Sequence, residues 1–120
     1  MKPSGIHHVS ICVRDTAEAV KFYTDVLGLT ELERPDFGFG GNWLDAGGQQ
    51  LHLMERDTPR SGSDHFAIRV DDLESAVADI RASGVTVNTV DHMKGAGYQA
   101  FLHDPSGNFI ELNQPDGLQP

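Results

Sequence analysis

The chain has 120 residues, enough for one small domain, and a formal charge of −9 at pH 7. Its nine Lys and Arg residues are scattered, which argues against a nucleic-acid partner, and no segment approaches the roughly 20 apolar residues that span a bilayer. The single cysteine, Cys12, excludes an intrachain disulfide, and residues 1–5 lack an apolar signal-peptide stretch, so we expect a cytoplasmic protein.

The first half of the chain predicts one helix among four strands. Alternation and turn residues place the strands at 6–13, 29–34, 42–46 and 49–54. The helix begins after Asp15, with Glu18 as a capping-box partner, and ends at Gly28. The loop 35–41 is rich in Gly and Phe, and with Trp43 it fits either a pocket wall or ordinary loop packing.

The second half repeats this order. Its strands are expected at 65–70, 85–90, 98–103 and 108–113. Asp72 caps a helix of about 73–82 that ends at Gly84. A polar segment at about 57–63, rich in turn residues, links the two halves, and residues 114–120 are expected to be a frayed tail.

The two halves are also similar in sequence, with matching residues 57 positions apart. The matching pairs are His8 and His65, Val13 and Val70, Asp15 and Asp72, Ala19 and Ala76, and Val20 and Val77. Because an internal repeat determines the architecture, we predict an α+β fold of two tandem βαβββ modules, at about 5–56 and 64–113.

A metal-binding side chain lies opposite the aliphatic residues in four of the predicted strands. These side chains are His8, His52, His65 and Glu111. Each module supplies one from its first strand and one from its last, so pairing of two modules would bring all four together. Three imidazoles and one carboxylate suit one divalent transition ion per site: Zn, Ni, Fe, Mn or Co. Four ligands fit a closed tetrahedral Zn site, whereas a six-coordinate ion keeps two positions for water or substrate.

Plainer interpretations compete with this one. An isolated histidine beside apolar residues is usually a surface or hydrogen-bonded residue, and we interpret His7, His92 and His103 in that way. Glu111 is alternatively a solvated strand residue. Other side chains share faces with the candidate ligands and are candidate substrate contacts: Arg69, Gln50, Met54, Phe109 and Asn113.

Several segments together resemble the vicinal oxygen chelate superfamily, over about residues 5–113. They are His7-His8-Val9 with Val13 and Asp15, Phe22-Tyr23 through Leu27-Gly28-Leu29, His65-Phe66-Ala67 with Val70-Asp71-Asp72, and Asp104-Pro105-Ser106-Gly107-Asn108-Phe109-Ile110-Glu111-Leu112. That superfamily includes glyoxalase I, methylmalonyl-CoA epimerase, extradiol dioxygenases, fosfomycin-resistance thiol transferases and metal-free bleomycin-binding proteins. The resemblance implies a single domain, 1–120, whose modules form a cupped, half-barrel mixed sheet, and a homodimer that binds a small molecule.

The resemblance also implies a metal site and a choice of chemistries. The family's ligand positions fall on His8, His52, His65 and Glu111, although glyoxalase I and the epimerase usually carry Glu or Gln where this chain has His52. Our first expectation is a glyoxalase-I-like lyase or isomerase that acts through a metal-stabilised enediolate, with Glu111 as the catalytic base. One alternative is an Fe(II) ring-cleaving dioxygenase that uses His8, His65 and Glu111. The other is a non-catalytic drug- or metabolite-binding protein of the bleomycin-resistance type.

Overall fold

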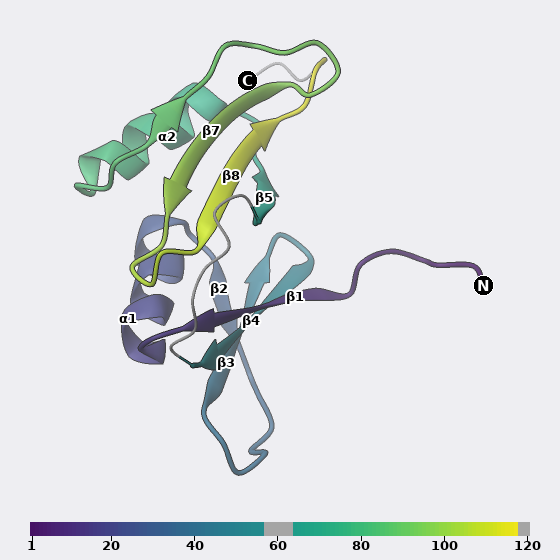
Figure 1. Cartoon of the computed structure of the whole chain (residues 1–120), viewed down its shortest axis with the longest axis vertical. Helices are drawn as coiled ribbons and strands as arrows, with labels where there is room; N and C mark the ends of the chain where they lie inside the picture. Colours follow the sequence, from purple (N-terminus) through teal and green to yellow (C-terminus); the bar gives the residue numbers. More distant parts are fainter. Residues whose placement is uncertain (57–63, 118–120) are drawn as a thin grey trace. The chain divides into compact units, whose positions relative to one another are not determined.

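The protein consists of two units of similar build. A computed structural model describes residues 1–56 and 64–117, and its contacts divide into the compact units Met1–Pro59 and Arg60–Pro120, here called module one and module two. Figure 1 shows a sheet and a principal helix in each. The predicted linker at 57–63 lies outside the described residues. The prediction of an α+β fold made of two βαβββ modules is confirmed.

Module one forms an open, mixed, four-stranded sheet. Its elements are β1 (His8–Val13), α1 (Thr16–Lys21), a π-helical segment η1 (Phe22–Val26), β2 (Thr30–Leu32), β3 (Gly41–Ala46) and β4 (Gln49–Glu55). The strand order is β1-β4-β3-β2, with β1 parallel to β4 and the other neighbours antiparallel. The first and last strands of the module are therefore hydrogen-bonded neighbours.

Module two repeats this topology. Its elements are β5 (His65–Arg69), α2 (Leu73–Ala82), β6 (Asn88–Thr89), β7 (Tyr98–His103) and β8 (Phe109–Gln114). The order β5-β8-β7-β6 again places the first strand parallel to the last. The predicted strand at 85–90 is shortened to two residues; the Val87 carbonyl accepts a hydrogen bond from Arg81 Nη2 at 2.8 Å.

Both helices begin where the sequence predicts. The Asp15 carboxylate accepts a hydrogen bond from the Glu18 N–H at 3.0 Å, and the Asp72 carboxylate accepts one from the Ser75 N–H at 3.1 Å. These contacts satisfy backbone donors that have no partner within the helix. The Glu18 side chain, however, contacts Arg14 at 2.9 Å rather than the backbone of Asp15, so the predicted capping box is only half formed.

The first helix differs from the prediction in its second half. The sequence predicts one α-helix from Asp15 to Gly28, whereas the structure changes to π-helical geometry at η1. The Leu27 N–H donates to the Phe22 carbonyl, five residues earlier. Phe22 and Tyr23 are both buried in this segment, with their rings edge-to-face at 5.2 Å. The wider turn is accompanied by burial of two adjacent aromatic rings.

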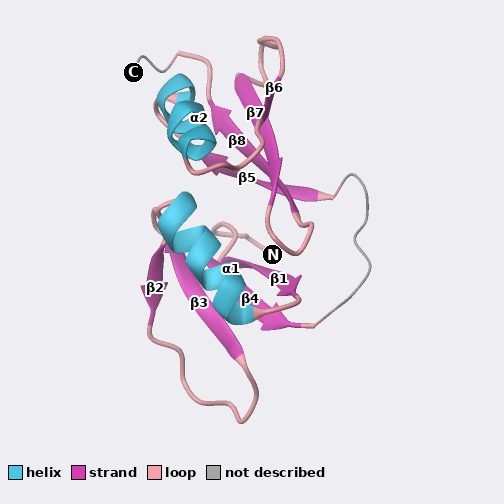
Figure 2. Cartoon of the chain, turned by 90° about the vertical axis from the view of Figure 1, so that its left-hand side faces the viewer, coloured by secondary structure: helices cyan, strands magenta, loops and turns pink. Residues whose placement is uncertain are grey.

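The core of each module lies between the sheet and its own helix. Figure 2 shows α1 against the sheet of module one and α2 against that of module two, in agreement with the contacts of each helix. Fully buried aliphatic side chains include Leu44 and Leu53 in module one and Leu102 and Ile110 in module two. The aliphatic face of each sheet therefore packs on a helix, which leaves the opposite face to the polar side chains.

The end of β8 corrects the predicted tail. Gln114 is a strand residue and is only 8% exposed. Its Oε1 atom accepts a hydrogen bond from the Leu73 N–H, at the start of α2, at 2.9 Å. The segment 114–120 is polar and contains two prolines, which predicts a frayed tail, but this hydrogen bond satisfies the buried amide oxygen of Gln114.

Candidate functional site

The candidate ligands lie on the sheet faces opposite the helices. In β4, Leu51 and Leu53 are at most 3% exposed, whereas the intervening His52 is half-buried. In β8, Ile110 and Leu112 are buried on the helix side, and Glu111 projects from the other face. The alternation therefore separates core from donor face in both modules.

The register between the first and last strands is the same in the two modules. In module one, Ser10 pairs with His52, and His8 lies two residues before Ser10 on β1. In module two, Ala67 pairs with Glu111, and His65 lies two residues before Ala67 on β5. Each module consequently presents a diagonal pair of donors from neighbouring parallel strands.

The donor pair of module one is a stack of rings. The His8 and His52 rings are parallel within 14°, with centroids 4.0 Å apart. Trp43 of β3 covers the other face of His52, at 4.5 Å and 11°. The Gln50 Oε1 atom lies 2.8 Å from His52 Nε2. When Gln50 accepts this hydrogen bond, Nε2 carries the proton and Nδ1 keeps its lone pair for a ligand.

The surroundings of His52 also favour its neutral form. The pKa of His52 is lowered, mainly by burial and then by the nearby positive charges of His8, His7 and Arg34. A neutral imidazole is the form that binds a metal ion. The environment of His52 therefore suits ligation at neutral pH.

The donor pair of module two joins an imidazole to a buried carboxylate. Glu111 is 7% exposed, and its Oε1 atom lies 3.1 Å from His65 Nε2. Its Oε2 atom accepts hydrogen bonds from Gln99 Nε2 at 3.2 Å and from Asn113 Nδ2 at 2.8 Å. The carboxylate is shielded from water and hydrogen-bonded through both oxygens, so the alternative interpretation of Glu111 as a solvated strand residue is wrong.

The five candidate substrate contacts differ in their surroundings. Gln50 and Asn113 already bind the candidate ligands. The Phe109 ring lies 5.5 Å from His65 and stacks on Phe101 at 5.3 Å. Met54 lines a cavity of about 220 Å³ in module one, and Arg69 is exposed at the end of β5, beside Asn113 in register.

Two contributors to these pairs are not predicted by the sequence. Gln99 is not among the candidate residues, and Trp43 is expected only in a pocket wall or in ordinary loop packing. Trp43 pairs in register with His52 on the neighbouring strand. Gln99 pairs with Asn113, which lies two residues after Glu111 on β8. These positions are visible only when strand register is known, because the partners are far apart in sequence.

The structure brings the four predicted ligands together as two pairs. Within either module, the residues in 1–56 and 64–117 contain no cluster of three or more His, Cys, Asp or Glu side chains suited to a metal ion. A closed zinc site needs four ligands, and catalytic zinc usually has three from the protein. Convergence of the two pairs on one ion therefore stays a prediction.

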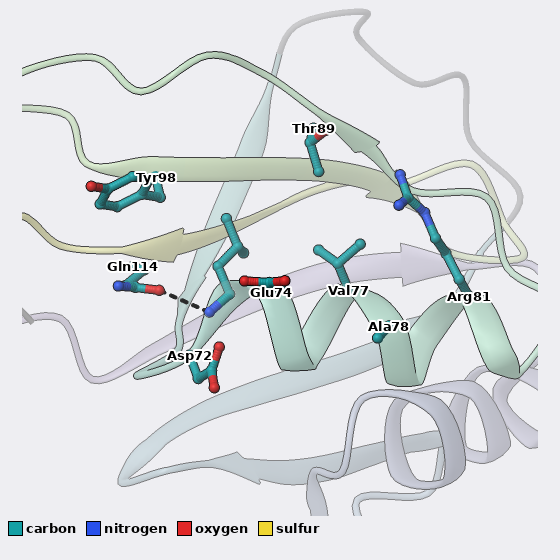
Figure 3. Close-up of a pocket in the computed structure, with 9 residues that line it drawn as sticks. Asp72, Glu74, Val77, Ala78, Arg81, Thr89, Tyr98 and Gln114 are labelled. Atoms are coloured by element: carbon teal, nitrogen blue, oxygen red, sulfur yellow. Dashed lines mark hydrogen bonds between the residues drawn. The ribbon is translucent and has the colours of Figure 1, made fainter. Parts of the chain in front are cut away.

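A separate cavity lies in module two between α2 and the strands β6 and β7 (Figure 3). Its volume is about 480 Å³, and its walls include Glu74 and Arg81 of α2 and Tyr98 of β7. Its β8 wall is Gln114, which projects from the face opposite Glu111. This cavity is therefore not part of the donor face.

No helix in the described parts of the chain is long and apolar enough to cross a membrane.

Three similar proteins illustrate the range of the relatives. Glyoxylase I 4 of Arabidopsis thaliana is 30% identical over 96% of this chain and 73% of its own length. The structure of a Bacillus anthracis protein assigned to the glyoxalase family superposes with a TM-score of 0.86 at 26% identity, covering 97% of this chain and 98% of that one. TnmS3, an antibiotic binding protein from Streptomyces sp. CB03234, gives a TM-score of 0.79 at 30% identity, over 97% and 99% of the two chains.

Another relative shows that similarity at this level does not select a reaction. Metapyrocatechase of Pseudomonas sp. (strain CF600) is also 30% identical, over 88% of this chain, but the match covers only 36% of that enzyme. A family model matches residues 5–112, nearly the whole described chain. With the repeated fold and the repeated register, this match shows that the chain belongs to the Glyoxalase/Bleomycin resistance protein/Dioxygenase superfamily.

Proposed function

We propose that this protein is a divalent-metal-dependent lyase or isomerase of the glyoxalase I type. The observation that carries the proposal is the repeated diagonal donor pair, His8 with His52 and His65 with Glu111, set by the same register in both modules. Imidazole nitrogen and carboxylate oxygen fit Zn, Ni, Fe, Mn or Co. A pair of modules, within one chain or across a homodimer, would supply all four ligands.

The donor set suits a reaction in which negative charge develops on oxygen. A bound divalent ion would polarise two neighbouring substrate oxygens and offset that charge. Glu111 would move the proton between carbon atoms through Oε1, because Oε2 is already engaged by Gln99 and Asn113. Such base catalysis typically contributes about 10²- to 10⁴-fold. Arg69, exposed beside this face, would hold an anionic group of the substrate.

The neutral His52 side chain affects the net charge of the proposed site. With three neutral imidazoles and one carboxylate, a divalent ion keeps a net charge of about +1, whereas a second carboxylate would cancel it. The additional positive charge favours an anionic substrate or intermediate over a neutral one.

Metal analysis of the purified protein tests the proposal. We expect about one divalent ion per site, removed by His65→Ala together with Glu111→Ala and retained after His103→Ala, the matched control. Full loading of the double variant would overturn the ligand assignment. Loaded protein is then assayed with methylglyoxal and glutathione, and separately with catechol and oxygen. Oxygen uptake without lyase activity would replace the proposal with the dioxygenase alternative.

A non-catalytic binding protein is the second candidate, and one observation favours it. Phe37 and Phe39 are 50% and 65% exposed, and Arg34 lies over both rings, at 4.9 and 5.2 Å. Neighbouring exposed apolar rings can mark a ligand-binding groove. The antibiotic-binding relative is consistent with this candidate. Tight binding of a planar ligand by metal-free protein, without turnover, would support it.

A further inference from the structure

The Glu111 carboxylate is held asymmetrically. Oε2 accepts two hydrogen bonds, from Gln99 Nε2 at 3.2 Å and Asn113 Nδ2 at 2.8 Å, while Oε1 lies 3.1 Å from His65 Nε2. Hydrogen bonds to a carboxylate are about twice as strong as those between neutral groups. One oxygen is therefore anchored by the sheet, and the other faces the histidine donor.

The amide of Asn113 is fixed in one orientation. Its Nδ2 atom also donates to the Ala96 carbonyl, at 2.8 Å. An amide nitrogen has two hydrogens, and both are used, one for Ala96 and one for Glu111. Turning the amide over would place its oxygen against two acceptors, so the orientation is determined by its partners. Asn113 consequently has no N–H left for a substrate.

The Ala96 carbonyl belongs to a tight turn that lies against the end of β8. Gly97, with φ of 81°, donates to the Met93 carbonyl at 2.9 Å. A Cβ atom at Gly97 would lie 2.5 Å from the Gln114 carbonyl oxygen, so only glycine allows this close approach. The Asp116 carboxylate accepts from the Gly95 N–H at 2.8 Å. The acceptor for Asn113 is thus held in place by the backbone.

Module one has no equivalent of this arrangement. Gln99 and Asn113 are partners across β7 and β8, two residues from the pair formed by Phe101 and Glu111. In the same position of module one, Gly41 pairs with Met54, two residues from the pair formed by Trp43 and His52. Neither Gly41 nor Met54 has a side-chain donor. The amide pair is therefore specific to the module that carries the carboxylate.

We propose that Gln99 and Asn113 are positioning residues that hold Oε2 of Glu111 and reserve Oε1 for the metal ion and for proton transfer. The Ala96 carbonyl sets the direction of the Asn113 amide. This inference rests on the proposed function, since it assigns roles to the groups around Glu111, which is one of the proposed metal ligands. A ligand oxygen that is fixed before the ion binds loses less freedom on binding.

Metal affinity tests the proposal. Apo protein is titrated with Co²⁺ against a competing chelator for wild type, Gln99→Ala, Asn113→Ala and Asn113→Asp, with Asn88→Ala as a control on the exposed strand β6. We expect the affinity to fall about 10- to 100-fold in Gln99→Ala and Asn113→Ala, with no change in the control. Asn113→Asp removes the amide donor while keeping the shape of the side chain, so that Oε2 of Glu111 loses the same anchor as in Asn113→Ala.

A spectroscopic signature separates positioning from general stability. Releasing Oε2 allows Glu111 to bind through both oxygens, so the visible absorption of the Co²⁺ complex should change in the Gln99 and Asn113 variants. Wild-type affinity and an unchanged spectrum in both alanine variants would overturn the proposal. If Asn113→Ala fails to fold, Gln99→Ala decides, because the Gln99 amide donates to Glu111, whereas the Asn113 amide also donates to the Ala96 carbonyl.

A metal-free measurement distinguishes this inference from the proposed function. In ¹H–¹⁵N spectra of apo protein, Glu111→Ala should shift the side-chain amide signals of both Gln99 and Asn113. Unshifted amides would overturn the positioning roles. Wild-type protein that binds no divalent ion would overturn the proposed function instead, and the amide shifts would still show whether the carboxylate is held.

Discussion

The two modules share a backbone but differ in the chemistry of their donor faces. Leu44 and Leu51 pair across the sheet of module one just as Leu102 and Ile110 do in module two. On the opposite face, module one stacks His52 between His8 and Trp43, whereas module two buries a carboxylate among amides. The helix-side face thus preserves the fold, and the other face is free to diverge.

Truncation of the matched core residues should test the shared half of this comparison. Leu44 and Leu102 occupy equivalent positions and are 0% and 1% exposed. We expect Leu44→Ala and Leu102→Ala each to lower the free energy of unfolding by about 2–5 kcal/mol, because each leaves a cavity in a packed core. Denaturant unfolding followed by circular dichroism measures both. A loss below about 1 kcal/mol in only one variant would show that the two cores are not equivalent.

Replacement of one ligand in each module should sharpen the difference between them. Glu111→Gln removes the only charge among the four ligands, whereas His52→Gln replaces one neutral donor with another. We expect the affinity for a divalent ion to fall more than about 100-fold for Glu111→Gln and about 10-fold for His52→Gln. Isothermal titration with Zn²⁺ checks both. Equal losses would indicate that the charge of Glu111 contributes little.

The matched helix caps predict a smaller and equal effect. Asp15 and Asp72 each accept one backbone hydrogen bond, from Glu18 and Ser75. Asp15→Ala and Asp72→Ala should each cost about 1 kcal/mol of stability. Thermal unfolding measures the change, with Asn and Ser at the same positions as capping controls. Recovery by Asn or Ser would separate loss of the cap from loss of charge.

The smallest predicted effect belongs to module two and concerns acid stability. The pKa of the Asp116 carboxyl is lowered, first by its hydrogen bond with His92 and then by the Gly95 N–H. A carboxyl with a lowered folded pKa contributes stability above the usual Asp range, and this contribution is lost as the pH falls through the folded pKa. Asp116→Asn should therefore destabilise slightly at pH 7, and its stability should converge with that of wild type as the pH falls below the folded pKa of Asp116. Urea unfolding from pH 7 into acid measures the free energy of unfolding of both proteins. A difference between them that persists in acid would contradict the prediction.

Residue patterning was sufficient to predict the fold and the donor faces. Alternation predicts that Leu51 and Leu53 lie on the core side of β4, and the repeat relates His8 to His65. The alternation is local and the repeat is periodic, so both can be recognised from the order of the residues alone. The π-helical segment at Phe22 was missed because its helical spacing of apolar residues is the same as that of an α-helix.

The details of the candidate site depend on pairings between distant residues. Nothing in the spacing of Gln99, Glu111 and Asn113 indicates that two amides share one carboxylate oxygen. The position of Trp43 on His52 likewise depends on the register of β3 against β4. Such contacts arise only after the strands are aligned, and the meeting of the two donor pairs requires association of modules as well.

The ring stack in module one also gives the protein an internal optical probe. Trp43 is the only tryptophan in the chain, and its indole lies flat on His52. Placing a proton or a cation on that imidazole changes the electric field at the indole face. The intrinsic fluorescence should therefore respond to protonation or ligation of His52, and these events can be followed without a label.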